Sequence, residues 1–262
     1  MSYKDDIFLP ARNSLRIKQD ERETVIRSCR EITSYSKKCI FSIHRDLEKV
    51  QLKKELIEYL IVIREHLITI NEIYFNDNFQ LRGTISGAIE ELIEFFTFCC
   101  YKYHSELIQY ERFIELINLI TNDLKEIENV VTYILNEESD IILLWAPTLT
   151  SPMIDKADYL MGLFDCTGEI MRMVISNSTD THGKFKNLET LNDYNFMKKL
   201  YENYILLQSY YPGISIYNGI FDDSINSKGN NSFKKKLQVF ESSINKIENT
   251  LIDLLISDKE IL

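Results

Sequence analysis

The sequence predicts an all-α protein, a single-domain bundle of about seven helices over residues 1–262. Only 8 residues are Gly and 4 are Pro, so few positions interrupt a helix. Apolar residues recur at spacings of three and four along most of the chain, which is the period of a helix with one buried face. One domain is expected at this length, because single cores grow to roughly 250 residues before chains divide. The N-terminus, to about residue 12, is expected to be poorly ordered.

The first half of the chain supplies four predicted helices. The segment from about Asn13 to Leu47 contains neither Gly nor Pro and carries a long apolar stripe. A polar segment, FNDN, ends the second helix, and Thr84 or Ser86 is suited to cap the third. The second, third and fourth helices run from about Leu52 to Ile73, from near Ser86 through Cys100, and from Ser105 to Asn136 with a break near Tyr110.

The second half of the chain supplies three more predicted helices. Glu137 to Thr150 breaks the helical pattern, and we expect an apolar connector there because no second strand is available to pair with it. Pro152 suits the first turn of the next helix, and Pro212 with Gly213 ends the one after it. The three helices run from about Ser151 to Ser176, Asn187 to Tyr210 and Ser232 to Ile256, with a Gly/Asn/Ser-rich loop over 216–231.

Charge and composition limit the function classes. The net charge of −10 and pI near 5.0 argue against broad nonspecific nucleic-acid binding by the free chain. The longest apolar run, Ile141 to Ala146, is far shorter than the roughly 18 residues of a membrane span, and the N-terminus lacks the apolar core of a signal peptide. A soluble protein without a membrane partner is expected. Five cysteines without CxxC spacing indicate buried free thiols rather than disulfides or a zinc site.

Two groups of carboxylates lie within apolar helical stretches. Glu91 and Glu94 are three residues apart in SGAIEELIEFFTF, with Glu90 also in reach of Glu94. Asp165 and Glu169 are four apart, with Asp158 a further turn back. If the two helices are neighbours, these carboxylates converge and need a compensating cation, and oxygen ligands select hard ions such as Mg²⁺ or Mn²⁺. Such a site suits phosphodiester cleavage.

A simpler interpretation stays open, because carboxylates at these spacings are common on solvated helix faces. Arg172, three residues after Glu169, is placed for an ordinary intrahelical ion pair. Basic residues are equally ambiguous. Lys37 and Lys38 lie on a basic stripe of the first helix that acidic residues interrupt, and FKKKL at 233–237 is the kind of cluster that is common where helices begin.

Three segments resemble the translin family, and in particular its translin-associated factor X (TRAX) branch. REITSYSKKCIFSIHR (30–45) resembles the first-helix signature of that branch, and DYLMGLFDCTGEIMRMVISN (158–177) is similar to its most diagnostic segment. KKLQVFESSINKIEN (235–249) resembles the last-helix signature. The segments keep their order and span most of the chain. Because ISGAIEELIEFFTF carries two glutamates where translin proper has basic and apolar residues, the resemblance points to TRAX.

The resemblance implies a translin-like helical fold and assigns site residues. It places catalytic carboxylates at Glu91, Glu94 and Asp165, and Mg²⁺ (or Mn²⁺) ligands at these three and Glu169. Gly87-Ala88 stands where the family has Pro-Gly, so a register shifted by one residue, with Glu90 in place of Glu91, stays open. Weaker candidates for phosphate contacts are Lys37, Lys38 and Arg82.

The function implied by the resemblance is that of an endoribonuclease subunit. Such a subunit joins a translin-like subunit in a closed hetero-oligomer and cleaves single-stranded RNA, such as the passenger strand of a small interfering RNA or fragments of tRNA. Single-stranded DNA is a second ligand to consider. A cytoplasmic and nuclear location is expected. The alternative is a noncatalytic helical scaffold, or a nucleic-acid-binding partner, that stabilises translin.

Overall fold

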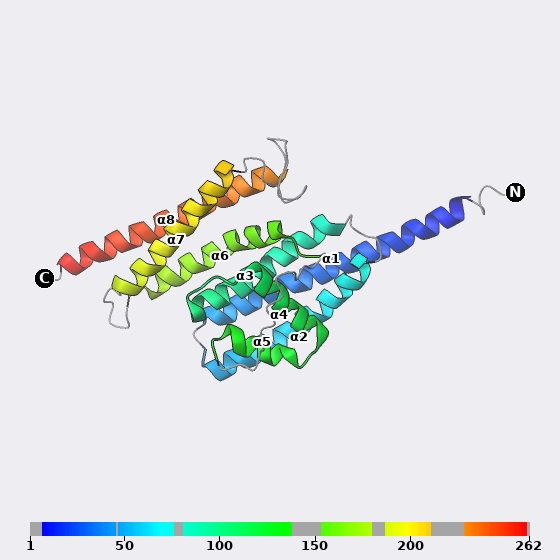
Figure 1. Ribbon diagram of the computed structural model, residues 1–262, viewed down its shortest axis with the longest axis horizontal. Coiled ribbons are helices and arrows are strands. Elements are labelled where there is room, and N and C mark those ends of the chain that lie inside the picture. The colour runs from blue at the N-terminus through cyan, green and yellow to red at the C-terminus, as the bar shows by residue number, and fades with distance from the viewer. Residues whose placement is uncertain are drawn as a thin grey trace. The chain divides into compact units, whose positions relative to one another are not determined.

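A computed structural model describes residues 7–45, 47–75, 81–137, 153–179, 187–210 and 228–260, which form α-helices joined by short non-helical segments. The all-α prediction is confirmed, since these residues contain no β-strand. The described helices, in chain order (Figure 1), are α1 (Leu9–His44), α2 (Lys49–Phe75), α3 (Arg82–His104), α4 (Tyr110–Asn122), α5 (Glu126–Ile134), α6 (Lys156–Asn177), α7 (Asn187–Tyr210) and α8 (Lys228–Glu260). None of them is long and apolar enough to cross a membrane.

The described residues form eight helices rather than about seven, because the predicted helix from Ser105 to Asn136 is divided in two. Ser105 has a φ of 60°, a left-handed conformation that separates α3 from α4. Between α4 and α5 the Asp123 carboxylate accepts a hydrogen bond from the backbone N–H of Lys125 at 3.0 Å, which stabilises a turn. Neither break contains Gly or Pro. The pattern of apolar residues continues across the break between α4 and α5.

Other boundaries differ by a few residues. The first helix begins at Leu9, earlier than the predicted Asn13, with Pro10 in its first turn. The last helix begins at Lys228 rather than Ser232. The predicted connector lies outside the described residues apart from Glu137, and so does the predicted loop 216–231 up to residue 227.

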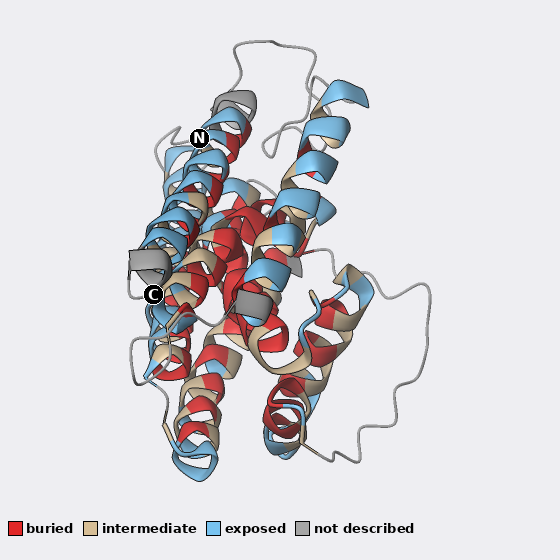
Figure 2. Cartoon of the chain, turned by 90° about the vertical axis from the view of Figure 1, so that its left-hand side faces the viewer, coloured by how far each residue is buried: buried red, intermediate tan, exposed pale blue. Residues whose placement is uncertain are grey.

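The helices group into two compact units, with α3 contributing to both. The first unit comprises residues 1–92 and 111–154, and in it α1 packs along α2. Figure 2 shows that helices of the chain have a buried face and an exposed face. The α2 side chains that are completely or almost completely buried follow the expected spacing of three and four: Leu52, Leu56, Leu60, Ile63, Leu67 and Ile70. The first turns of α1 take no part in this core, since residues 9–24 include no buried side chain.

The second unit comprises residues 93–110 and 155–262, and in it α6 packs against α7 and α8. Four aromatic side chains join the three helices. The rings of Phe164 on α6 and Tyr204 on α7 are stacked with centroids 3.8 Å apart, and the α8 rings of Phe233 and Phe240 lie edge-on to Phe164 at 5.1 and 6.3 Å. Because Asp165 follows Phe164, this aromatic cluster sets the position of a predicted site residue.

Candidate functional site: a carboxylate cluster neutralised by lysine and arginine

The start of α6 is fixed by two aspartates. The Asp155 carboxylate caps the helix by accepting a hydrogen bond from the N–H of Ala157 at 3.3 Å, and the Asp158 carboxylate accepts one from the N–H of Asp155 at 2.9 Å. Asp158 is completely buried in this capping box. The sequence suggested that Asp158 belongs with the other carboxylates, but its carboxylate binds the backbone at the helix start.

Three of the predicted carboxylates come together in the second unit, and we call Glu94, Asp165 and Glu169 the carboxylate cluster. Glu94 and Glu169 are only 8% and 7% exposed, whereas 35% of the Asp165 side chain is exposed. All three act on one thiol: burial raises the pKa of Cys166 well above its usual value, and the charges of Glu94, Glu169, Cys100 and Asp165 raise it further. The cluster therefore combines residues of α3 and α6.

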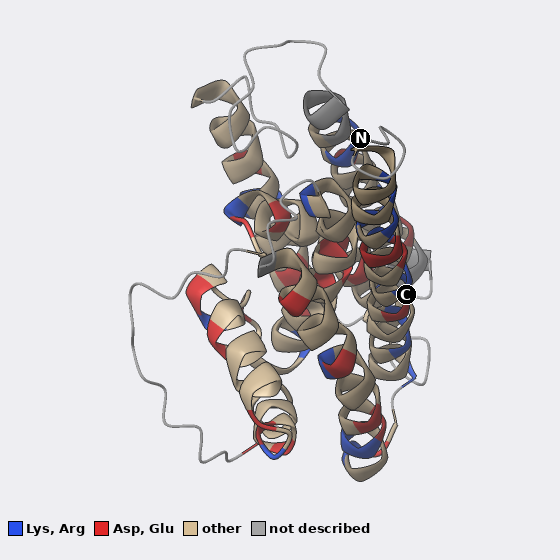
Figure 3. Cartoon of the chain, turned by 90° about the vertical axis from the view of Figure 1, so that its right-hand side faces the viewer, with Lys and Arg blue, Asp and Glu red and all other residues tan. Residues whose placement is uncertain are grey.

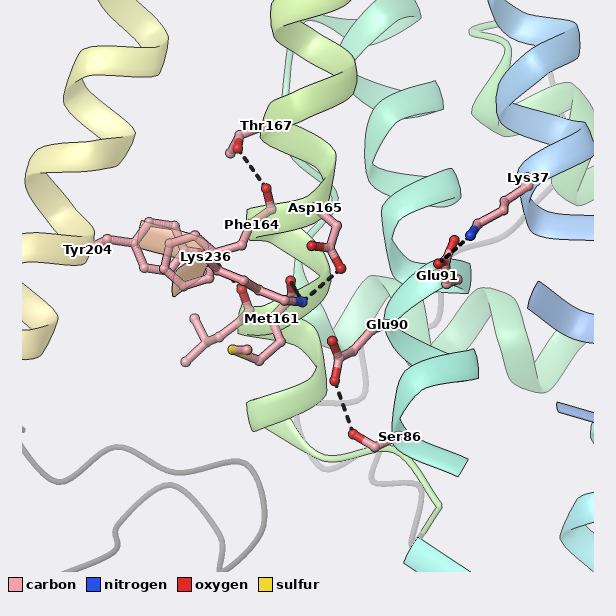
Figure 4. A network of polar contacts seen from close by, with 11 residues as sticks. Lys37, Ser86, Glu90, Glu91, Met161, Phe164, Asp165, Thr167, Tyr204 and Lys236 are labelled. Carbon is pink, nitrogen blue, oxygen red and sulfur yellow. Dashed lines mark hydrogen bonds and ion pairs between the residues drawn. The ribbon is translucent and has the colours of Figure 1, made fainter. Parts of the chain in front are cut away.

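Two basic side chains neutralise most of this charge. The Lys236 Nζ, from α8, lies 2.7 Å from the Oδ2 of Asp165 and donates a second hydrogen bond to the Met161 carbonyl at 3.0 Å (Figure 4). The Arg172 guanidinium forms an ion pair with Glu169, so the intrahelical pair that the sequence left open is confirmed. Each of these two cations therefore pairs with one carboxylate of the cluster.

The oxygen-only donors of the cluster suit a hard divalent ion such as Mg²⁺. In their present positions, however, the described residues include no group of three His, Cys, Asp or Glu side chains that could hold a metal ion. The lysine and the arginine occupy the carboxylate oxygens instead. The type of side chain therefore fits the implied ion, while Asp165 and Glu169 each bind a basic side chain through one carboxylate oxygen.

Glu91 and Glu90 lie on the part of α3 that belongs to the first unit. The Glu91 Oε1 is 3.0 Å from the Nζ of Lys37 on α1, and Glu90 accepts a hydrogen bond from the Ser86 hydroxyl at 3.2 Å (Figure 4). Glu91 precedes Glu94 by three residues on the same helix. That Glu91, or Glu90 in the shifted register, shares a site with Asp165 remains a prediction.

The candidate phosphate contacts all lie in the first unit. Lys37 is bound to Glu91, while the Lys38 Nζ lies 3.7 Å from the centroid of the Tyr35 ring, a cation–π contact. Arg82 is the first residue of α3 and is half-buried. Figure 3 shows that basic and acidic residues are interspersed along the helices. RNA binding by these three residues remains a prediction.

Sequence reasoning missed Lys236 as a site residue. Its signal was the FKKKL cluster, in which Lys234 and Lys235 are exposed and Lys236 is half-buried. Spacing within α8 distinguishes them, because Phe233, Lys236 and Phe240 lie three and four residues apart on one face of the helix. The buried aromatic neighbours mark Lys236 as the lysine that points inward.

We expect the cysteines to be unreactive in the native chain at pH 8. All five are buried free thiols, and burial raises the pKa of Cys29 to about 11 and that of Cys166 well above its usual value, so the reactive thiolate is scarce. Titration with a thiol reagent, followed by mass spectrometry, should detect labelling only after denaturation. Rapid native labelling of Cys166 would contradict the packing of the carboxylate cluster around it.

The translin family matches this chain over residues 20–258. "Translin-associated protein X" of Rattus norvegicus is 24% identical to it, over 97% of this chain and 79% of the relative. "Translin-associated protein X homolog" of Schizosaccharomyces pombe is 25% identical, over 93% of this chain and 85% of the relative. The matched region includes α6 and α8, which carry Asp165, Glu169 and Lys236. The chain therefore belongs to the translin family.

Proposed function

We propose that this chain is the TRAX-like catalytic subunit of a hetero-oligomeric endoribonuclease that cleaves single-stranded RNA with the help of Mg²⁺. The observation that carries the proposal is the carboxylate cluster itself. Two glutamates that are more than nine-tenths buried and one aspartate are held around Cys166 by helices from separate parts of the sequence. Repulsion between grouped carboxylates destabilises the fold, and a catalytic role would explain why the residues are nevertheless grouped.

The roles of the residues follow from their chemistry. Glu94, Asp165 and Glu169 would hold the ion, with Glu91 as the further predicted ligand. When bound, a divalent ion supplies positive charge that stabilises the negative charge developing on the phosphate during cleavage. Asp165 is the most exposed of the three clustered carboxylates, so it is the one best placed to meet an RNA phosphate.

Partner binding is supported by the exposed apolar side chains of the first and last helices. Phe8, which immediately precedes α1, and Leu15 and Ile17 in its first turns are 68%, 68% and 60% exposed. On α8, Val239 and Ile252 are 63% and 53% exposed. Exposed apolar side chains contribute no hydrophobic stabilisation. A translin-like subunit that covers them would bury their apolar surface and stabilise the complex.

We expect the free chain to bind RNA weakly and a translin-like partner to strengthen binding at least about tenfold, since phosphate binding requires positive charge and the free chain has a net charge of −10. Fluorescence polarisation of labelled single-stranded RNA, at fixed salt, compares the chain, the partner and their complex. Cleavage is then measured on the same RNA in Mg²⁺ and in chelator, with the partner alone as control. Cleavage by the complex only in Mg²⁺ supports the proposal.

One observation favours the alternative of a noncatalytic scaffold. Asp165 and Glu169 already have basic partners, as the carboxylates of a purely structural cluster would. A scaffold strengthens assembly but leaves RNA cleavage at the level of the partner alone, whether Mg²⁺ is present or not. Such a result would reject the nuclease and retain the scaffold.

A further inference from the structure

Lys236 is anchored to α6 at two points. Its ammonium donates one hydrogen bond to Asp165 at 2.7 Å and another to the carbonyl of Met161, one turn earlier, at 3.0 Å. Only 20% of its side chain is exposed. Because a lysine side chain loses considerable freedom when it is fixed in this way, the contact is a specific feature rather than a surface ion pair.

The two basic residues of the site differ in kind. Arg172 is on the same helix as Glu169, and 65% of its side chain is exposed, so water shares its charge. Lys236 comes from a different helix, and its position depends on the packing of α8 on α6 through Phe164 and Phe233. Lys236 is therefore the cation of the site that tertiary packing, rather than its own helix, brings to the carboxylate cluster.

We propose that Lys236 is a positioning residue whose ammonium takes the place of the divalent ion, neutralising Asp165 in the unloaded chain and leaving it when the ion binds. The inference rests on the proposed function, because it takes Asp165 to be an ion ligand. The physical reason is repulsion: an ammonium at hydrogen-bond distance and a divalent ion cannot share one carboxylate without strong like-charge repulsion. Exchange of one cation for the other keeps the cluster neutralised throughout.

Replacing Lys236 tests this exchange. In Lys236→Met the aliphatic length is kept and the charge is removed, so without divalent ions the melting temperature should fall by about 5 °C. The affinity for Mg²⁺, measured by calorimetry, should rise at least about tenfold because the ion no longer displaces a competitor. Lys236→Arg, which retains the charge, should stay near wild type. Lys235→Met is the matched control. Lys235 precedes Lys236 and is exposed, so its replacement should change neither the melting temperature nor the affinity for Mg²⁺.

A measurement on the wild-type chain avoids any dependence on how the variant folds. Acetylation of lysines by an amine reagent, read by mass spectrometry, reports whether the Lys236 ammonium is held. Labelling of Lys236 should increase several-fold as Mg²⁺ is added, while Lys234 and Lys235 keep a constant, higher labelling. In Asp165→Asn, Lys236 should be labelled readily even without the ion.

The possible failures are distinguishable. If wild type binds Mg²⁺ but Lys236→Met binds it no more tightly and labelling of Lys236 stays constant, the exchange is overturned while the nuclease proposal survives. If neither the chain nor its complex binds Mg²⁺, both are overturned. Tighter binding in Lys236→Met together with ion-dependent labelling of the wild type establishes the exchange, whether or not RNA is cleaved.

Discussion

Replacing Asp165 with asparagine is expected to reduce RNA cleavage by the assembled complex by orders of magnitude. The substitution keeps the size of the side chain and removes the charge that attracts both Lys236 and a divalent ion. Assembly and RNA binding should be retained, because Asp165 on α6 binds Lys236 of α8 and is not one of the exposed apolar side chains proposed to meet the partner. The measurement is cleavage of a labelled single-stranded RNA, wild type against variant, in Mg²⁺ and in chelator.

Asp193→Asn is a suitable control for this experiment. Asp193 is also a half-buried aspartate of the second unit, but it accepts a hydrogen bond from the Tyr101 hydroxyl at 2.6 Å and lies outside the carboxylate cluster. Burial raises the pKa of its carboxyl, so a neutral side chain is tolerated there. Full activity in Asp165→Asn, or equal losses in the two variants, would count against a catalytic role for the cluster.

The sequence predicted the residue types of the site better than its electrostatics. Apolar periodicity placed Glu94 on one helix and Asp165 with Glu169 on another, and family resemblance suggested that the two helices meet. The contribution of α8 could not be obtained in this way. Which face of α8 packs on α6 depends on aromatic contacts between residues about 70 positions apart, and spacing within one helix carries no information about such pairs.

The breaks around α4 show a similar limit. A helix boundary without Gly or Pro is set by local hydrogen bonds, such as the one between Asp123 and the Lys125 backbone, and by a single left-handed residue, Ser105. The boundary at Ser105 was predicted, with the fourth helix starting there and a break near Tyr110, whereas the turn at Asp123 was missed because the buried face resumes in phase in the next helix. The ion pair between Lys37 and Glu91 was likewise missed, because both were considered separately as ligands for an external partner.

The aromatic cluster that positions the site should also dominate the stability of the second unit. Phe240 is completely buried, and its ring lies 5.5 Å from that of Tyr201, 6.1 Å from that of Tyr204 and 6.3 Å from that of Phe164. Phe240→Ala removes these contacts and leaves a cavity, so the free energy of unfolding should fall by about 3–5 kcal/mol. Urea denaturation followed by circular dichroism measures this loss.

Val239→Ala is the matched control, because Val239 is the preceding residue of the same helix and is 63% exposed. Its effect should stay within about 0.5 kcal/mol. If Phe240→Ala is as mild as the control, α8 is not held on α6 by these rings, and the close approach of Lys236 to Asp165 loses its structural basis. A large loss in Phe240→Ala, combined with increased acetylation of Lys236 below the unfolding transition, would show that the same packing stabilises the unit and brings the lysine to the aspartate.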